Sequence, residues 1–370
     1  MAIKMKILYL TNLPSPYRVD FFNELGKKSS LTVLFERRHA NDREKDWISE
    51  NVVNFEAIFL KGINIGMDGA FCPTVVNWLK RRKYDVFVIG GYSTPTGMLA
   101  IQALKIKKIP FFLNIDGGMI KEDKFFNLHV KRYLIGSAKW WLSSGESTNS
   151  YLKHYGADLD KTYIYPFTSL KKKDIFEKPA LRKQKQELRK ALELKDTKTI
   201  ISVGRFIDGK GFETLIKSWP SVDEPCQLII IGGGPKKDSY LELISKMKID
   251  NIIVRDFVDK EKLKEYYRAS DLFVFSTESD VWGLVINEAM ASGLPIISTD
   301  RCVAAVELVQ NGENGYIVPV NEGDTMVERI NSILSDEKLQ HNMGIKNIKI
   351  INNYTIEKMA EIHYTIFIKK

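Results

Sequence analysis

Apolar and polar positions alternate along the chain in two successive series of short apolar runs and amphipathic segments. Short runs rich in Ile, Val, Leu and Phe are typical of buried strands, whereas apolar residues three or four positions apart indicate helices. In the first half, predicted strands cover residues 6–11, 31–35, 55–60, 86–89, 111–114 and 163–165, and a further short strand is predicted just before the helix over 148–155. Predicted helices there cover residues 19–28, 75–82, 98–107, 125–137 and 148–155.

The second half repeats this alternation. Its predicted strands cover residues 200–203, 228–231, 252–254, 272–275, 295–298 and 315–318. Its predicted helices cover residues 182–192, 212–218, 240–247, 260–269 and 284–291, with further helices between 325 and 352 and a last one over 355–368. Such alternation predicts an α/β protein of two doubly wound, Rossmann-like domains with a cleft between them.

The boundary between the two domains is predicted in a polar, turn-rich stretch from Thr168 to Pro179, which we interpret as a linker. We therefore predict a first domain over residues 1–167 and a second over 168–352, followed by a helical segment over 353–370 that is apolar enough to pack on a domain. The chain has 370 residues, enough for two domains that each bury a core.

The net charge of +9 is concentrated in the first half. Residues 1–167 carry 24 Lys+Arg against 16 Asp+Glu, a net +8, whereas residues 168–370 carry 31 against 30, a net +1. This excess, which includes the basic run at 80–83, indicates a surface that meets anions such as phospholipid headgroups, a phosphorylated substrate or nucleic acid. A solvated lysine-rich face is the alternative.

Cysteine usage and hydropathy favour a cytoplasmic protein. Cys72, Cys226 and Cys302 are far apart and form no CxxC, so neither a disulfide framework nor a zinc site is indicated. The N-terminal apolar run is too short for a signal peptide, and no apolar run reaches membrane-spanning length.

Two features of the first half concern ligands. The loop after the first strand, residues 12–18, contains no glycine, which argues against a dinucleotide site there because that site needs glycines for the approach of a pyrophosphate. The strand over 111–114 is followed by Asp116-Gly117-Gly118, and ligands of open α/β sheets bind at the carboxyl ends of strands.

The predicted helix over residues 125–137 is amphipathic and is followed by Trp140 and Trp141. It carries Phe125 and Phe126 together with nearby lysines, so it could lie on an anionic membrane surface. An ordinary amphipathic helix packed on the sheet is the alternative, which we favour.

The stretch from Asp280 to Glu288 lies between two predicted strands and reads as loop followed by helix. A helix that begins near Gly283 leaves unpaired backbone N–H groups at its N-terminus, where they and the helix dipole suit an anion. Asp280 precedes that end and Glu288 lies inside the helix, so both carboxylates can accept hydrogen bonds from hydroxyl groups attached to the anion. Alternatively, Asp280 caps the helix and Glu288 is solvated.

The strand over 200–203 is followed by Gly204-Arg205 and then by Gly209-Lys210-Gly211. The spacing resembles a P-loop, but Gly211 replaces the hydroxyl residue that ligates magnesium, which disfavours an ATPase. Arg205 and Lys210 suit a diphosphate held by two cations without metal; a turn with two solvated cations is the alternative.

A second glycine loop, Gly232-Gly233-Gly234, also follows a predicted strand. Asp158 and Asp160 have the spacing of a metal-binding DxD motif, but no strand delivers them, and we interpret them as solvated acids. Three strand-end loops in the second half thus offer cations, glycines and a helix N-terminus with carboxylates. Anion together with polyol is the chemistry of a nucleoside diphosphate sugar.

These residues resemble glycosyltransferase family 4 of the GT-B fold. Gly204-Arg205 with Lys210-Gly211 is similar to the diphosphate-binding motif of that family, and Asp280-x7-Glu288 is similar to its E-x7-E motif, with Asp in place of the first Glu. The resemblance implies a cleft between two domains, a C-terminal helix that crosses back onto the first domain, and retention of anomeric configuration. It also implies a reaction without metal or cofactor.

The resemblance further implies roles for individual residues. Arg205 and Lys210 would neutralise the departing diphosphate, Glu288 would accept the ribose hydroxyls, and Asp280 would hold hydroxyls of the donor sugar. Electrostatic stabilisation of the departing charge would then be the main catalytic term. The other donor-side residues would be Gly204, Gly233, Phe257, Val258, Gly283, Leu284 and Val285, with the bonds to phosphate made by backbone N–H groups near Gly283.

The N-terminal segments resemble those of bacterial capsule, exopolysaccharide and O-antigen transferases, whose acceptors are commonly lipid-linked sugars at the inner membrane face. The acceptor-side loop would include Pro16, Tyr17, Arg18 and Tyr92. Many relatives carry His where this chain has Asp116, so Asp116, which we include among the catalytic candidates, could instead bind sugar hydroxyls or orient the acceptor.

We therefore predict a retaining, metal-independent glycosyltransferase that moves a hexosyl or N-acetylhexosaminyl group from a UDP-sugar to a sugar acceptor, with lipid-linked saccharides as the favoured class. The protein would be cytoplasmic, and its basic first domain could meet the inner face of the plasma membrane. The alternatives are a GT-B nucleotide-sugar 2-epimerase, which needs no acceptor, and a non-catalytic sugar-nucleotide-binding protein. Nucleic acid is not an expected partner, because the basic residues form no recognisable motif.

Overall fold

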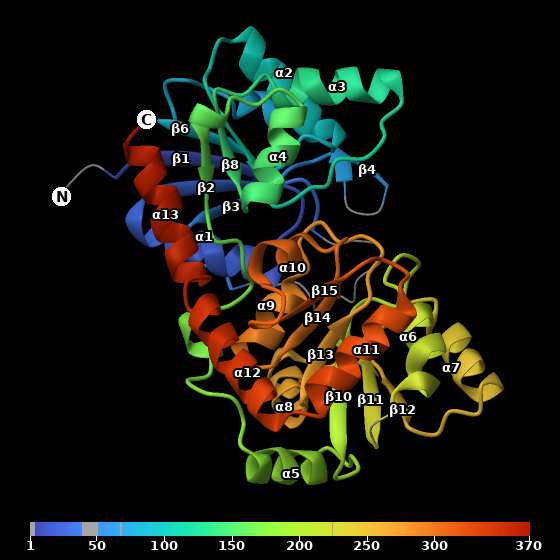
Figure 1. Ribbon diagram of the computed structural model, residues 1–370. Helices are drawn as coiled ribbons and strands as arrows, with labels where there is room; N and C mark the ends of the chain where they lie inside the picture. Colours follow the sequence, from blue (N-terminus) through green and yellow to red (C-terminus); the bar gives the residue numbers. More distant parts are fainter. Residues whose placement is uncertain (1–3, 39–50, 67–68, 224) are drawn as a thin grey trace. The chain divides into compact units, whose positions relative to one another are not determined.

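The computed structural model describes residues 4–38, 51–66, 69–223 and 225–370. It forms two compact units, residues 1–169 with 355–370 and residues 170–354. Unit 1 therefore contains both ends of the chain, whereas unit 2 is one continuous segment. Each unit is built on its own sheet (Figure 1).

Unit 1 holds a seven-stranded sheet of order β3-β2-β1-β6-β7-β8-β9, in which every neighbouring pair is parallel. Its strands are β1 (Lys6–Thr11), β2 (Ser30–Phe35), β3 (Glu56–Phe59), β6 (Val86–Ile89), β7 (Phe112–Ile115), β8 (Trp140–Ser143) and β9 (Thr162–Ile164). Its helices are α1 (Pro16–Lys28), α2 (Pro95–Ile106), α3 (Phe125–Ile135), α4 (Glu146–His154) and α13 (Ile356–Ile368).

Unit 2 holds a six-stranded parallel sheet of order β12-β11-β10-β13-β14-β15. Its strands are β10 (Lys198–Val203), β11 (Cys226–Ile231), β12 (Ile252–Arg255), β13 (Leu272–Phe275), β14 (Ile296–Thr299) and β15 (Gly315–Val318). Its helices are α5 (Arg182–Ala191), α6 (Phe212–Ser218), α7 (Lys237–Lys246), α8 (Lys260–Ala269), α9 (Leu284–Ala291), α10 (Val303–Leu308), α11 (Gly323–Leu334) and α12 (Glu337–Ile351).

Both sheets are doubly wound, as predicted. In unit 1 the strand order reverses beside β1, so that β2 and β6 flank it, and in unit 2 it reverses beside β10, flanked by β11 and β13. In open parallel sheets the loops on either side of such a reversal diverge and leave room for a ligand at the carboxyl ends of the strands. The loops that follow β10 and β13 are therefore the place to look for a site in unit 2.

The last helix of the chain packs in unit 1. In Figure 1, α13 lies beside α1 and the first sheet. The ring of His363 on α13 lies 4.8 Å from that of Phe21 on α1, and Phe367 lies 5.0 Å from Phe112 on β7, both in edge-to-face geometry. Such aromatic contacts add to the burial of the apolar face of the helix.

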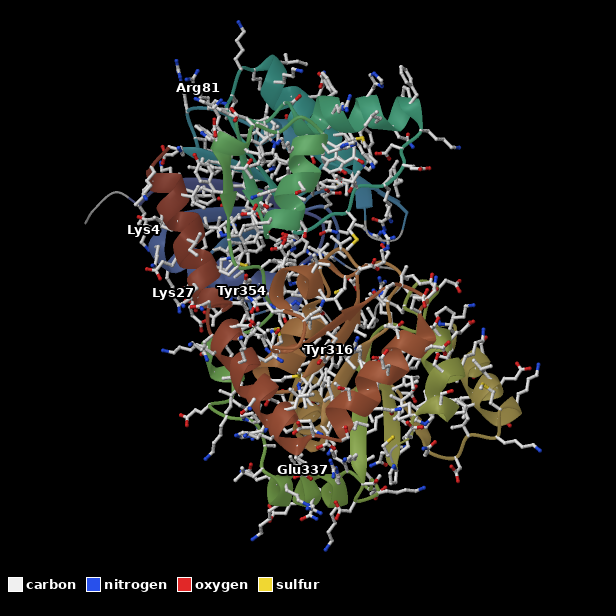
Figure 2. All side chains as sticks on the ribbon, viewed as in Figure 1. Lys4, Lys27, Arg81, Tyr316, Glu337 and Tyr354 are labelled. Carbon is white, nitrogen blue, oxygen red and sulfur yellow. The ribbon has the colours of Figure 1, made fainter. Side chains whose placement is uncertain are left out.

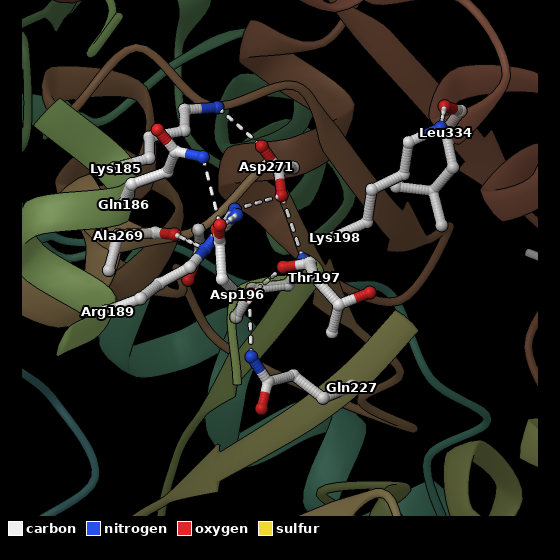
Figure 3. Close-up of polar contacts among 12 residues, drawn as sticks. Lys185, Gln186, Arg189, Asp196, Thr197, Lys198, Gln227, Ala269, Asp271 and Leu334 are labelled. Atoms are coloured by element: carbon white, nitrogen blue, oxygen red, sulfur yellow. Dashed lines mark hydrogen bonds and ion pairs between the residues drawn. The ribbon is translucent and has the colours of Figure 1, made fainter. Parts of the chain in front are cut away.

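Helix α5, near the start of unit 2, is attached to the sheet of that unit by a group of buried polar contacts (Figure 3). Asp271, just before β13, accepts from Arg189 at 2.5 Å and from Lys185 at 2.7 Å, and also from the backbone N–H of Thr199 on β10 at 2.8 Å. Because both cations come from α5, one carboxylate fixes the helix to the start of two neighbouring strands.

One predicted helix was wrong, two elements were not predicted, and one helix begins earlier than predicted. Residues 75–82 do not form an α-helix: a short 3-10 helix, Pro73–Asn77, is followed by tight turns, in which Lys80 N–H donates to the Trp78 carbonyl at 2.9 Å. The hairpin of β4 (Ile63–Ile65) and β5 (Gly69–Phe71) and the short helix α10 were not predicted. Helix α1 begins at Pro16, three residues before the predicted start, because proline is favoured in the first helical turn.

None of the described helices is both long enough and apolar enough to cross a membrane.

Candidate functional site

The loops that follow four neighbouring strands of unit 2 gather at one edge of its sheet. They are residues 204–211 after β10, 232–234 after β11, 256–258 after β12 and 276–283 after β13. Parallel strands all end at the same edge, so the predicted donor-side residues Gly204, Gly233, Phe257 and Val258 lie in this set of loops. Phe257 is 55% exposed.

The loop after β10 is tied to the loop after β13 by three hydrogen bonds. The hydroxyl of Thr277 and the backbone N–H of Glu278 donate to the Gly209 carbonyl at 3.0 and 2.9 Å, and the Ser276 hydroxyl donates to the Gly211 carbonyl at 2.8 Å. Gly211 has φ +68°, and a Cβ there would lie 1.8 Å from the Ser276 carbonyl oxygen. The close approach of the two loops therefore requires glycine at 211.

This approach brings together two of the predicted catalytic residues. The Lys210 ammonium forms an ion pair with the Asp280 carboxylate, and the two side chains are only 11% and 20% exposed. The other Asp280 oxygen accepts from the backbone N–H of Trp282 at 3.2 Å, and the Lys210 ammonium lies 5.6 Å from the centre of the Phe275 ring. A cation and a carboxylate are thus held side by side at the strand edge.

The helix that starts beside this ion pair begins as predicted. Gly283 is the N-cap of α9 with φ +94°, and a Cβ there would lie 2.5 Å from the sulfur of the buried Cys302. Leu284 and Val285 form the first turn and are half-buried. The N-terminal backbone of α9 is therefore next to Lys210 and Asp280, and a helix N-terminus favours a bound anion.

Glu288 lies one turn further into α9 and is half-buried. The hydroxyl of the buried Tyr267 donates to its carboxylate at 3.4 Å. Burial, together with the nearby charge of Glu288, raises the pKa of Tyr267 well above its ordinary value. Tyr267 therefore remains a protonated donor that orients one oxygen of Glu288.

Arg205 is exposed on the loop that also carries Lys210. The loop is joined to the loop after β11, because the Gly204 N–H donates to the Ile231 carbonyl at 3.0 Å and the Phe206 N–H donates to the Gly233 carbonyl at 2.7 Å. The structure thus places the two predicted cations and Glu288 on loops and a helix that follow adjacent strands, β10 and β13.

A second polar group lies at the carboxyl edge of the sheet of unit 1. The carboxylate of Asp116, after β7, forms an ion pair with the buried Arg18. It also accepts from the Tyr165 hydroxyl at 2.6 Å and from the Asn114 side chain at 2.7 Å. Asp116 is thus held in one orientation by three donors, of which Arg18 and Tyr165 come from distant parts of the sequence.

The predicted acceptor-side loop needs a correction. Pro16, Tyr17 and Arg18 form the first turn of α1, because Pro16 already has the backbone angle of a helix and needs no N–H partner there. Tyr92 does lie in a loop, after β6, and its hydroxyl is hydrogen-bonded to the hydroxyl of Tyr151. Arg18 on α1 and the loops with Tyr92 and Asp116 follow β1, β6 and β7, which are neighbours in the sheet.

Sequence reasoning missed several residues that shape these two groups. Ser276 and Thr277 fix the glycine loop of unit 2, and a signal for them was available, since their loop follows the strand next to β10. Tyr165 and His363 belong to the Asp116 group. No local pattern indicates them, because they come from segments remote from Asp116.

The sequence analysis predicted no metal site. Among the residues that the structure describes, no group of three His, Cys, Asp or Glu side chains is placed to hold a metal ion. Asp158, in the DxD-like pair, caps a short 3-10 helix by accepting from the Asp160 N–H at 3.1 Å and pairs with Lys161 at 2.6 Å.

Comparison with known proteins gives a family match within the second half of the chain. Residues 184–350 match the family model described as glycosyl transferases group 1. The chain is 31% identical over 154 residues to the Campylobacter jejuni N-acetylgalactosamine-N,N'-diacetylbacillosaminyl-diphospho-undecaprenol 4-alpha-N-acetylgalactosaminyltransferase, a match that covers 41% of the chain and 42% of that enzyme. It is 28% identical over 207 residues to the Staphylococcus aureus capsular polysaccharide biosynthesis glycosyltransferase CapM, covering 53% of each.

These matches span about half the length of the curated relatives. Over the full length, the fold is similar to that of HepE from Anabaena in complex with UDP, with a TM-score of 0.80, 17% sequence identity, and coverage of 99% of this chain and 100% of HepE. This likeness confirms the predicted GT-B fold class.

Proposed function

We propose that the chain transfers a sugar from a nucleotide sugar to a saccharide acceptor, as a member of the glycosyl transferases group 1 family whose model residues 184–350 match. The observation that carries the proposal is the junction of two loops in unit 2. There, Lys210 and Asp280 are paired beside the N-terminus of α9, at the point where the strand order reverses.

The proposed donor is a UDP-sugar, bound by unit 2. Its diphosphate would lie between Lys210, Arg205 and the first N–H groups of α9, where fixed positive charge stabilises the negative charge that develops as the sugar leaves. Glu288 would accept the ribose hydroxyls, with its orientation set by Tyr267. The exposed Phe257 and its neighbour Val258, after β12, would contact the base. HepE, which shares the fold, forms a complex with UDP.

Asp280 has two tasks in this proposal. It holds the Lys210 ammonium in place in the free protein, and it offers its carboxylate to hydroxyls of the donor sugar. An aspartate reaches one methylene less far than the glutamate of the resembling motif. In the free protein, the shorter side chain of Asp280 reaches the Lys210 ammonium.

The proposed reaction belongs to family 4, retains anomeric configuration and uses neither metal nor cofactor. Two side-chain cations and the start of α9 would supply the positive charge that a metal gives in other transferases. A proton from the acceptor hydroxyl would pass to the departing diphosphate, so that no further side-chain base is needed.

The proposed acceptor is a lipid-linked saccharide, bound by unit 1 near Asp116, Arg18 and Tyr92. The Campylobacter relative is named for a diphospho-undecaprenol-linked substrate, and CapM for capsular polysaccharide biosynthesis. Phe125 and Phe126 of α3 are 79% and 76% exposed beside Lys121 and Lys124, whereas Leu134 and Ile135 at the other end are buried. The start of α3 could therefore rest on an anionic membrane at the cytoplasmic face.

The role of Lys210 can be tested by its removal. In a transfer assay with UDP-sugars and extracted lipid-linked acceptors, Lys210→Ala should lower the turnover number about 100- to 1000-fold, as expected for loss of one stabiliser of developing charge. The protein should remain folded, because the pair lies in loops at the end of the sheet and outside its core, and thermal melting verifies this.

The matched control is Lys346→Ala. Lys346 also pairs with a carboxylate of unit 2, that of Glu313, but both side chains are largely exposed and lie outside the site. Turnover should be unchanged in the control. Near-normal transfer by a folded Lys210→Ala protein would exclude the diphosphate role. A product formed from the UDP-sugar without acceptor would point to an epimerase instead.

A further inference from the structure

An open hollow of about 600 Å³ lies at the amino ends of the strands of the unit 1 sheet, at the end opposite to Asp116. Four adjacent strands, β6, β7, β8 and β9, begin there, and the segments that lead into them line the hollow. The polar group with Asp116 lies at the other end of these strands. Because β7 has four residues, which corresponds to a length of about 13 Å, at least this length of sheet separates the hollow from that group.

The lining of the hollow contains both basic and apolar side chains. The cations come from the turn before β6, from the end of α2 and the turn that follows it, and from the residues just before β8 and β9. Arg81 is seen at the outer margin of unit 1 (Figure 2). Buried apolar side chains, including Phe111 and Trp141, form the floor. The basic lining residues are Arg81, Lys105, Lys108, Lys139 and Lys161.

The positive charge of the hollow is largely uncompensated. Its lining includes five basic side chains and no carboxylate. Lys161 pairs with Asp158, outside the lining, at 2.6 Å. Lys105 and Lys139 contact aromatic rings instead, at 3.9 Å from the centre of Tyr133 and 4.6 Å from the centre of Trp140. A concave surface lined by one sign of charge concentrates the field and attracts the opposite charge.

Helix ends explain only part of this charge. Helices α2 and α3 both end near the hollow, at Ile106 and Ile135, and a helix C-terminus favours nearby cations. Lys107, outside the lining, is used elsewhere: its ammonium donates to the carbonyls of Val76, in the 3-10 helix before β6, and of Leu79, just after it, at 3.0 and 3.1 Å. Arg81 and Lys139 belong to neither helix.

We propose that this hollow binds an anion that carries two or more phosphate groups. Several lysines and one arginine that reach one hollow from four segments can contact separate phosphate oxygens together, and Arg81 can do so in bidentate geometry. The anion could be a free polyphosphate or a phosphorylated lipid headgroup. The exposed Ile106, 74% accessible between Lys105 and Lys107, would suit the lipid source.

The test compares two sets of lysine substitutions in the full chain. The hollow variant carries Lys105→Gln, Lys108→Gln and Lys139→Gln. The control carries Lys28→Gln, Lys61→Gln and Lys153→Gln, three exposed lysines of the same unit outside the lining. Each of the two variants loses three positive charges. Thermal melting verifies that both remain folded.

Two probes distinguish the sources of phosphate. Calorimetry measures binding of inorganic tripolyphosphate, and co-sedimentation measures binding to phosphatidylcholine vesicles with and without cardiolipin, whose headgroup carries two phosphates. Hydrogen exchange of residues 104–111 and 137–141 then locates tripolyphosphate, so that binding at the donor loops of unit 2 is recognised separately.

We expect one probe to bind the wild type and the control equally, and the hollow variant at least about tenfold more weakly, a change of about 1.4 kcal/mol. Selective loss of tripolyphosphate with protection of the hollow identifies a free polyphosphate, and selective loss of vesicles identifies a headgroup. Equal weakening in both variants would reduce the effect to net charge and overturn the proposal. Absence of binding by both probes, or protection confined to unit 2, would also overturn it.

Discussion

His363 shows how one buried side chain joins distant parts of the sequence. It lies on the last helix, is 1% exposed, and packs edge-on against Phe21 of α1 and Tyr165, at ring distances of 4.8 and 4.4 Å. Its Nδ1 lies 2.8 Å from the Met359 carbonyl oxygen and donates to it. Burial lowers the pKa of His363 from 6.5 to about 4, so the ring is neutral in the folded protein near pH 6.

This pKa predicts a loss of stability in mild acid. Between pH 6.5 and about 4 the unfolded chain binds a proton at His363 while the folded chain does not, so the free energy of unfolding should fall by about 3 kcal/mol as the pH is lowered through this window. His363→Phe should remove most of that loss, because phenylalanine fills a similar space without a titrating group.

Urea unfolding at a series of pH values from 7 to 4 measures the effect. If the two units unfold in separate transitions, the transition of unit 1 is the one to analyse. His129→Gln, on the exposed face of α3, is the control and should keep the full pH dependence. An unfolding free energy of the wild type that does not change over this range would contradict the account of His363.

At the scale of residues, the sequence predicted short-range features better than long-range pairs. The spacing of Lys210 behind β10 and of Asp280 behind β13 could be read from the strand pattern, and the structure places these two side chains in contact. The ion pair of Arg18 with Asp116 spans 98 positions. No periodicity links such residues, because their proximity depends on the order of strands in the sheet.

At the scale of elements, Asp174 connects the segment after unit 1 to α8. It is 4% exposed and accepts from Lys260 at 2.6 Å and from Lys264 at 2.8 Å, as well as from the Lys171 N–H at 2.9 Å. Burial alone would raise the pKa of Asp174, but the hydrogen bonds from the two lysines outweigh it and lower the pKa from 3.8 to about 2.

The lowered pKa predicts a second loss of stability at stronger acid. The ionised Asp174 stabilises the folded state above pH 4, and this contribution, about 2 kcal/mol, should be lost as the pH falls from about 4 to 2. In urea titrations at pH 7, Asp174→Asn should lower the free energy of unfolding by at least that amount, because Lys260 and Lys264 then lose their shared partner.

The corresponding surface pair provides the control. Asp158→Asn breaks an exposed pair with Lys161, and exposed pairs contribute little to stability, so this variant should change the unfolding free energy much less. Equal effects of the two substitutions would show that Asp174 does not hold the segment to α8.

Element boundaries depended on local chemistry that the hydrophobic pattern does not contain. The apolar residues Val75 and Leu79 are four positions apart, as in a helix, yet the chain forms a 3-10 helix and turns there. Both side chains are buried in that conformation, so burial alone did not distinguish it from a helix. The hairpin of β4 and β5 is short and largely exposed, and such a pair gives almost no periodic signal.

At the scale of the whole molecule, the alternation of strands and helices predicted two doubly wound units, and the structure has both. The predicted limits were residues 167 and 352, and the units change at residues 169 and 354. The order of strands could not be read from the sequence, because periodicity reports which face is buried and not which strand lies next to which. Reversal of that order beside β10 is what brings residues 204–211 and 276–283 together.

The central claim is that the carboxyl edge of unit 2 binds a nucleoside diphosphate through side-chain cations and the start of α9. Calorimetric titration of the full chain with UDP, with and without EDTA, tests it most directly. We predict saturable binding of one UDP per chain, unaffected by EDTA and strongly weakened in Arg205→Ala. Absence of saturable binding, or binding that EDTA abolishes, would contradict the account.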